Sequence, residues 1–112
     1  MRILGIDPGY GITGFGIVEA QRGACRLLRC GAITTPPNTD FNWRLGEIYN
    51  NMTELMQLAQ ADAVAIEELF FGNNVTTGIK VAQARGVILL AVQQAGVPVY
   101  EYKPCLLYTS PS

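Results

Sequence analysis

Residues 3–18 read ILGIDPGYGITGFGIV and contain the strongest structural signal in the chain. Its opening apolar run ends on an acid, Asp7, and Pro8 and Gly9 follow at once. Proline and glycine together predict a tight turn, and the alternation of apolar and small residues over 12–18 predicts a returning strand. We therefore expect a β-hairpin with a single carboxylate, that of Asp7, at the end of its first strand.

A second acid lies in a similar position. Glu67 directly follows the apolar run AVAI, residues 63–66, which is typical of a buried central strand. If the two strands are neighbours in one sheet, their ends place Asp7 and Glu67 about 5 Å apart, the spacing of adjacent strands. Two carboxylates at that spacing favour one or two hard divalent cations. Each acid alone is explained as well by a turn residue or a solvated strand end, but the pair favours a metal site.

The rest of the chain alternates between helix and strand. After the hairpin we expect a third strand, then an amphipathic helix capped by Thr39 or Asp40, a strand, a second helix and a last strand. The expected ranges are 2–7, 12–19 and 25–34 for the first strands, 40–60 and 76–95 for the helices, and 63–68 and 97–102 for the later strands. A three-stranded antiparallel meander followed by alternating helix and strand predicts an α/β fold with a mixed sheet.

The composition excludes several chemistries. The 112-residue chain contains no histidine, which excludes a Ser-His-Asp triad, a Cys-His pair and HExxH zinc sites within it. The net charge of -1 shows no excess of basic residues for binding a polyanion. Cys25, Cys30 and Cys105 lack zinc-ligand spacing and are interpreted as reduced thiols. No apolar run reaches the roughly 18 residues of a membrane span, and we expect a cytoplasmic protein without membrane contact.

Four motifs in this order resemble the RuvC family of Holliday junction resolvases, which are nucleases of the ribonuclease H-like fold. They are IDPG at residues 6–9, AIEE followed by FFGNN over 65–74, AQARG at 82–86 and PVYEYKP at 98–104. The resemblance covers the chain from residue 2 to about residue 104. It implies a ribonuclease H-like mixed sheet.

The resemblance also implies a function. A RuvC-like chain would be a metal-dependent, structure-specific endonuclease that nicks four-way DNA junctions during homologous recombination and repair. Asp7 and Glu67 are the implied catalytic residues and metal ligands. The implied cofactor is Mg²⁺, with two ions per active site in the full-length family and Mn²⁺ as an alternative. The implied DNA-binding residues are Phe70, Asn74, Lys80 and Arg85.

Two of these implied features also have plainer explanations. The ring of Phe70 would stack or wedge at the junction, but a phenylalanine is usually buried in the core. The helix over 76–95 is apolar nearly all round. It corresponds to the homodimer interface of the RuvC family, although a long helix in a small domain also packs on two neighbours within one chain. Besides junction DNA and a second copy, the resemblance implies the branch-migration proteins RuvA and RuvB as partners.

The end of the chain departs from the family. After Pro104 the sequence is CLLYTSPS, which has no amphipathic period. We expect residues 1–104 to be the N-terminal part of a RuvC-like nuclease domain, incomplete at its C-terminus, and 105–112 to be a disordered tail foreign to the family. Such a fragment is expected to be inactive alone. The alternatives from other classes are an actin-like ATP-binding phosphotransferase lobe and a non-catalytic junction-binding domain.

Overall fold

The structure, a computed structural model, describes residues 1–9, 11–67 and 75–102 of the chain. Within these ranges the strands and helices follow one another in the order expected from the sequence. The strands are β1 (Arg2–Asp7), β2 (Ile12–Gln21), β3 (Ala24–Thr34), β4 (Ala63–Glu67) and β5 (Val99–Tyr102). The helices are α1 (Phe41–Ala59) and α2 (Val75–Gln94).

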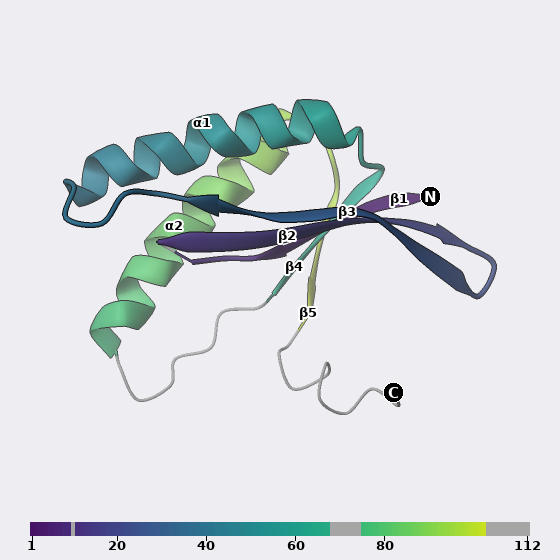
Figure 1. Cartoon of the computed structure of the whole chain (residues 1–112), viewed down its shortest axis with the longest axis horizontal. Coiled ribbons are helices and arrows are strands. Elements are labelled where there is room, and N and C mark those ends of the chain that lie inside the picture. The colour runs from purple at the N-terminus through teal and green to yellow at the C-terminus, as the bar shows by residue number, and fades with distance from the viewer. Residues whose placement is uncertain (10, 68–74, 103–112) are drawn as a thin grey trace.

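The described strands form one mixed sheet in the order β3-β2-β1-β4-β5 (Figure 1). The first three strands are an antiparallel meander, whereas β4 runs parallel to β1 on one side and to β5 on the other. This order makes β1 and β4 direct neighbours, although β2, β3 and α1 separate them in the sequence. The predicted meander followed by alternating helix and strand is therefore confirmed.

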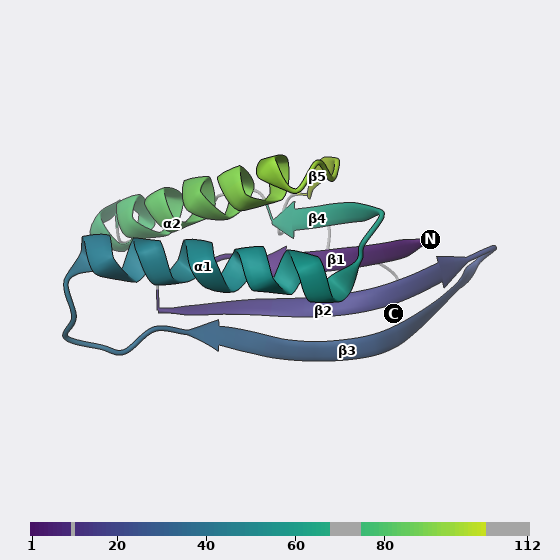
Figure 2. The same cartoon turned by 90° about the horizontal axis from the view of Figure 1, so that it is seen from above.

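Both helices lie side by side on the same face of the sheet (Figures 1 and 2). On α1, Ile48 and Met52 are fully buried and share one core cluster with Leu4 of β1 and Val64 of β4. Ile88 of α2 belongs to the same cluster. Full burial of one such side chain stabilises the fold by about 1.5–3 kcal/mol. The core therefore fixes β1 and β4 relative to each other from the helical face.

Helix α1 is bounded by local polar contacts. The Asp40 carboxylate accepts a hydrogen bond from the Trp43 backbone N–H at 3.1 Å, which identifies Asp40 as the N-cap. Thr39 instead donates its hydroxyl to the carbonyl of Pro36 at 2.8 Å. The helix ends at Ala59, and its C-cap Gln60 has a left-handed φ of 48°. The left-handed Gln60 is the point at which the chain leaves α1 and turns back to start β4.

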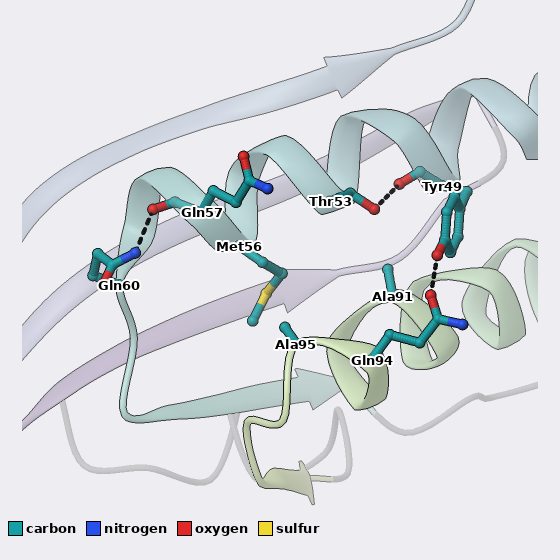
Figure 3. Close-up of a pocket in the computed structure, with 8 residues that line it drawn as sticks. All are labelled: Tyr49, Thr53, Met56, Gln57, Gln60, Ala91, Gln94 and Ala95. Carbon is teal, nitrogen blue, oxygen red and sulfur yellow. Dashed lines mark hydrogen bonds between the residues drawn. The ribbon is translucent and has the colours of Figure 1, made fainter.

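A groove of about 420 Å³ lies between the C-terminal halves of α1 and α2 (Figure 3). Tyr49 donates its hydroxyl to the side-chain oxygen of Gln94, so that one hydrogen bond joins the two helices beside this groove. Met56 and Ala91 are buried and supply apolar lining. The helix pair is thus held together both by the core beneath it and by a polar contact above it.

The bounds of the elements differ slightly from the predicted ones. β5 begins at Val99 rather than at residue 97, whereas residue 68, the last of the predicted strand 63–68, lies outside the described residues. Pro98 has no backbone N–H, and its carbonyl accepts a hydrogen bond from the N–H of Val64 at 2.9 Å just before the strand begins. Neither α1 nor α2, the helices in the described part of the chain, is long and apolar enough to cross a bilayer.

Candidate metal centre

Asp7 and Glu67 are the last residues of β1 and β4. The parallel register pairs Ile6 with Ile66, so that on each strand the next residue is an acid at the same edge of the sheet. Ile6 and Ile66 are buried in the core under the helices. Because side chains alternate along a strand, Asp7 and Glu67 point to the opposite face. The sheet therefore places the two carboxyl groups side by side and away from the core.

The two carboxyl groups interact directly. A side-chain hydrogen bond with Asp7 raises the pKa of Glu67 from 4.5 to about 7, and burial and the negative charge of Asp7 act in the same direction. In its protonated form the Glu67 carboxyl donates a hydrogen bond to a carboxyl oxygen of Asp7, which favours retention of the Glu67 proton. A divalent cation would compete with this proton, because it balances both negative charges at once.

The donor chemistry of the pair fits a hard divalent cation. Carboxylate oxygens are the ligands that Mg²⁺ and Mn²⁺ prefer, and Mg²⁺ commonly binds through one or two carboxylates while it keeps several waters. Residues 1–9, 11–67 and 75–102 hold no group of three or more His, Cys, Asp or Glu side chains arranged around a single point. Within this part of the chain, Asp7 and Glu67 therefore provide a two-carboxylate site.

A buried threonine fixes the turn that follows Asp7. Thr13 is 1% exposed, and its hydroxyl donates to the carbonyl of Gly9 at 2.9 Å and accepts from the N–H of Gly9 at 3.3 Å. A Cβ on Gly9 would lie 2.1 Å from the carbonyl oxygen of Ile12, so only glycine fits there. These contacts fix the backbone at Gly9, two residues beyond Asp7.

A second layer of contacts supports the same turn from α1. The backbone N–H of Thr35 donates to the carbonyl of Gly11 at 3.0 Å. The Nε of Arg44, in the first turns of α1, donates to the hydroxyl oxygen of Thr35 at 3.1 Å. The loop between β1 and β2 is thus tied to the start of α1, so the end of β1 is held from both sides.

With this geometry established, comparison with known proteins identifies the family. The family described as "Crossover junction endodeoxyribonuclease RuvC" matches residues 3–108. This chain belongs to the RuvC family. The crossover junction endodeoxyribonuclease RuvC of Chloroflexus aggregans is 53% identical over 104 residues, which are 93% of this chain and 63% of that protein. The RuvC of Brevibacillus brevis is 48% identical over 104 residues, again 93% of this chain and 63% of the relative. The chain thus spans less than two thirds of the length of these RuvC relatives.

Solved structures share the fold of this chain. "T. thermophilus RuvC in complex with Holliday junction substrate" superposes with a TM-score of 0.87 at 35% identity, over 97% of this chain and 68% of that one. The yeast mitochondrial Holliday junction resolvase Ydc2 superposes with a TM-score of 0.72 over 96% of this chain and 55% of that one. Its 12% identity shows likeness of fold alone. The ribonuclease H-like mixed sheet expected from the RuvC resemblance is confirmed.

Of the four residues predicted to contact DNA, two lie among the described residues. Phe70 and Asn74 lie outside the described residues. Lys80 is exposed on α2. Arg85, also on α2, has a side chain that is only 13% exposed and forms an ion pair with Glu101 at 2.9 Å. DNA contact by these residues stays a prediction for this RuvC chain, but the Arg85 guanidinium is already engaged within the protein.

Sequence reasoning did not identify Thr13, and it gave Arg85 a DNA-binding role rather than a contact with the end of β4. Thr13 carries no signal in the sequence, because a threonine in a strand is ordinary and its partner Gly9 becomes evident only once the turn is built. Arg85 does have a signal in retrospect. It is a cation in the middle of a largely apolar helix, where a buried charge needs a partner.

Proposed function

We propose that this chain contains two metal-binding acids of a junction resolvase, an enzyme that nicks four-way (Holliday) DNA junctions during homologous recombination and repair. The observation that supports this most strongly is the interacting pair Asp7 and Glu67 at the ends of two adjacent parallel strands. Membership of the RuvC family supports the same function. So does the likeness, at 35% identity, to a T. thermophilus RuvC in complex with a Holliday junction substrate.

Asp7 and Glu67 would hold Mg²⁺, or Mn²⁺ as an alternative, with two ions in a complete active site. When bound, such ions activate a water molecule for attack on a phosphodiester and stabilise the leaving oxygen. The chain's own role is to present two carboxylates on rigid strand ends. To bind the metal it must also release the proton held by Glu67. Because that proton is held with a pKa of about 7, metal affinity should rise as the pH increases through about 7.

The charge of the acid pair limits what it does alone. Two carboxylates supply a charge of about -2 against the +4 of two divalent ions. We therefore propose that a two-ion site needs oxygen ligands in addition to Asp7 and Glu67. On this view the 112 residues by themselves bind at most one ion, weakly, and do not cleave. The division into a nuclease part, residues 1–104, and a foreign tail, 105–112, is part of the same proposal.

Substrate and partners follow from the family. Phe70 and Asn74 would contact the junction near the acids, and Lys80 would contact the DNA backbone from α2. A homodimer through α2, residues 75–94, is supported by the exposure of Ile79 (51%) and Leu90 (49%), two large apolar side chains on that helix. RuvA and RuvB are the proposed branch-migration partners, and the proposed location is the cytoplasm.

The test uses a chimaera in which this chain replaces the matched segment of the Chloroflexus aggregans relative, so that the whole length of a RuvC protein is present. A labelled four-way junction is incubated with the chimaera in Mg²⁺ or Mn²⁺. We expect symmetric nicks from the wild-type chimaera. Asp7→Asn and Glu67→Gln should abolish nicking while junction binding persists, because both changes remove charge but little volume.

The matched control is Asp62→Asn. Asp62 also lies at a strand end, but at the opposite edge of the sheet, where its Oδ2 accepts from the backbone N–H of Arg2 at 2.8 Å. This variant should nick as wild type does. Nicking by Asp7→Asn at a near wild-type rate would contradict the proposal. Junction binding without any nicking by the wild-type chimaera would favour a non-catalytic domain, and saturable ATP binding would favour a phosphotransferase lobe.

A further inference from the structure

Arg85 connects α2 to the strand end that bears Glu67. Its Nε donates a hydrogen bond to the backbone carbonyl of Glu67 at 3.2 Å. Its Nη2 lies 2.9 Å from Oε1 of Glu101, an ion pair by distance although its angles fall short of those of a hydrogen bond. The Arg85 side chain is 13% exposed and that of Glu101 is 51% exposed. The guanidinium is therefore enclosed between two strand ends, and its acidic partner faces water.

The sheet register explains why one guanidinium reaches both strands. β4 and β5 are parallel, with Ile66 paired to Glu101 and Glu67 paired to Tyr102. Paired residues on neighbouring strands point to the same face, so Glu101 shares the helical face with the buried Ile66. Arg85 comes from α2 on this face, whereas the Glu67 carboxyl points to the other one. The contact to Glu67 is consequently made through its backbone.

We propose that Arg85, braced by Glu101, is a positioning residue that fixes the backbone of Glu67 and thereby the direction of its carboxylate towards Asp7. This inference rests on the proposed function of the acid pair. A planar guanidinium presents Nε to the Glu67 carbonyl and Nη2 to the Glu101 carboxylate at once, which the compact ammonium of a lysine does not. The role differs from the phosphate contact predicted from the sequence, because the groups that would face a phosphate are directed at Glu67 and Glu101.

The two possible roles of Arg85 predict different effects of changing Glu101, one on DNA affinity and the other on metal affinity. If Arg85 binds a DNA phosphate, Glu101→Gln frees the guanidinium and removes a negative charge, so junction binding should tighten. If Arg85 positions Glu67, Glu101→Gln loosens the brace, so the acid pair should bind a divalent cation less tightly even when no DNA is present. Metal affinity of the free protein therefore separates the two roles without any measurement of activity.

The experiment is a Mn²⁺ titration of the 112-residue chain at pH 8, with free Mn²⁺ measured by its electron paramagnetic resonance signal. The variants are Arg85→Lys and Glu101→Gln. Loss of the outer partners of metal ligands commonly lowers metal affinity by about 10–100-fold. We expect about a tenfold loss for Arg85→Lys, at the lower end of that range, and a smaller loss in the same direction for Glu101→Gln, whose side chain is half exposed.

The matched control is Arg2→Lys. Arg2 also donates to a backbone carbonyl at 3.2 Å, that of Ala59, but at the opposite edge of the sheet. A merely structural arginine should lower the melting temperature when changed and leave Mn²⁺ affinity as in wild type, and this is the result expected for Arg2→Lys. For Arg85→Lys we expect a fall in both quantities.

Wild-type Mn²⁺ affinity in Arg85→Lys and Glu101→Gln would overturn the positioning role. Asp7→Asn in the same titration separates failure of the positioning role from failure of the metal centre itself. If Asp7→Asn abolishes Mn²⁺ binding and the Arg85 and Glu101 variants bind normally, only the positioning role fails. If Asp7→Asn also binds normally, the metal centre and the positioning role both fail. Should Arg85→Lys not fold, the result for Glu101→Gln decides.

Discussion

Asp7 and Glu67 share a hydrogen bond between their side chains at the C-terminal ends of β1 and β4, and this bond is the main reason why the pKa of Glu67 is raised to about 7. Neither acid belongs to the core, so the pairing does little for packing. Two acids held this close destabilise the folded chain when both are ionised. Such an arrangement is typical of a functional site that a cation completes.

The raised pKa predicts how stability depends on pH. Between pH 4.5 and about 7 the folded chain retains a proton on Glu67 that the unfolded chain has released. The corresponding contribution to the free energy of unfolding is fully present below pH 4.5 and is lost as the pH rises through about 7. Without divalent ions, Asp7→Asn should therefore be more stable than wild type at pH 8, because Glu67 then ionises beside a neutral group.

Urea denaturation in EDTA at pH 5 and pH 8 measures this effect. Asp62→Asn is the control, since Asp62 accepts a backbone hydrogen bond and faces no second acid in the contacts described. It should lose stability at both pH values. If Asp7→Asn were less stable than wild type at pH 8, repulsion within the acid pair would be excluded as a source of instability.

The buried hydroxyl of Thr13 is predicted to stabilise the turn after Asp7. Thr13→Val keeps the shape of the side chain but leaves the N–H and carbonyl of Gly9 without this partner. We expect a loss of about 1–3 kcal/mol in the free energy of unfolding. Thr53→Val is the comparison, because Thr53 donates only to the carbonyl of Tyr49 within α1, and it should change stability far less. Equal effects of the two changes in denaturant melts would refute the special role of Thr13.

The ring of Phe70 is predicted to act on DNA rather than on folding. In the chimaera, Phe70→Ala should weaken junction binding by about 1–3 kcal/mol, the worth of one stacked base, with little change in melting temperature. Phe15→Ala is the control, since Phe15 packs against the hydrophobic core. Because this ring is only partly buried, the change should lower stability by no more than the roughly 3–5 kcal/mol of a fully buried ring. A large drop in melting temperature with unchanged junction affinity would assign Phe70 to the core.

The 112-residue chain by itself is predicted to lack junction cleavage, because Asp7 and Glu67 supply too little negative charge for two divalent ions. The measurement is incubation of the purified chain with a labelled four-way junction in Mg²⁺ and in Mn²⁺, with the chimaera as the positive control. Symmetric nicking by the 112-residue chain that disappears in Asp7→Asn would show that no further acids are needed.

The sequence predicts the elements of this fold well, because each is encoded by a local pattern. The apolar run before Glu67 is a strand, and the spacing of apolar residues in α1 follows the helical period. Local pattern does not state that β1 lies beside β4. From the sequence alone, β1 and β4 have to be assumed to be adjacent. Their adjacency determines whether Asp7 and Glu67 lie close together. It results from the crossover of α1, which burial in a common core enforces.

The contacts of Arg85 could not be predicted from the sequence for the same reason, because they depend on the arrangement of elements that are distant in the chain. An arginine in α2 reaches Glu67 and Glu101 only because α2 covers β4 and β5 and because their register aligns the two strand ends. None of these relationships is local. From the sequence alone Arg85 is one of several scattered cations, and a phosphate contact is then the natural hypothesis.

Anomalous diffraction from crystals of this chain, grown at pH 8 and soaked in Mn²⁺, tests whether Asp7 and Glu67 form a divalent metal centre. We predict an anomalous peak bonded to carboxylate oxygens of both Asp7 and Glu67, and its disappearance in crystals of Asp7→Asn. A map from well-occupied crystals with no peak at this pair, or with Mn²⁺ bound only at other acids, would contradict the account.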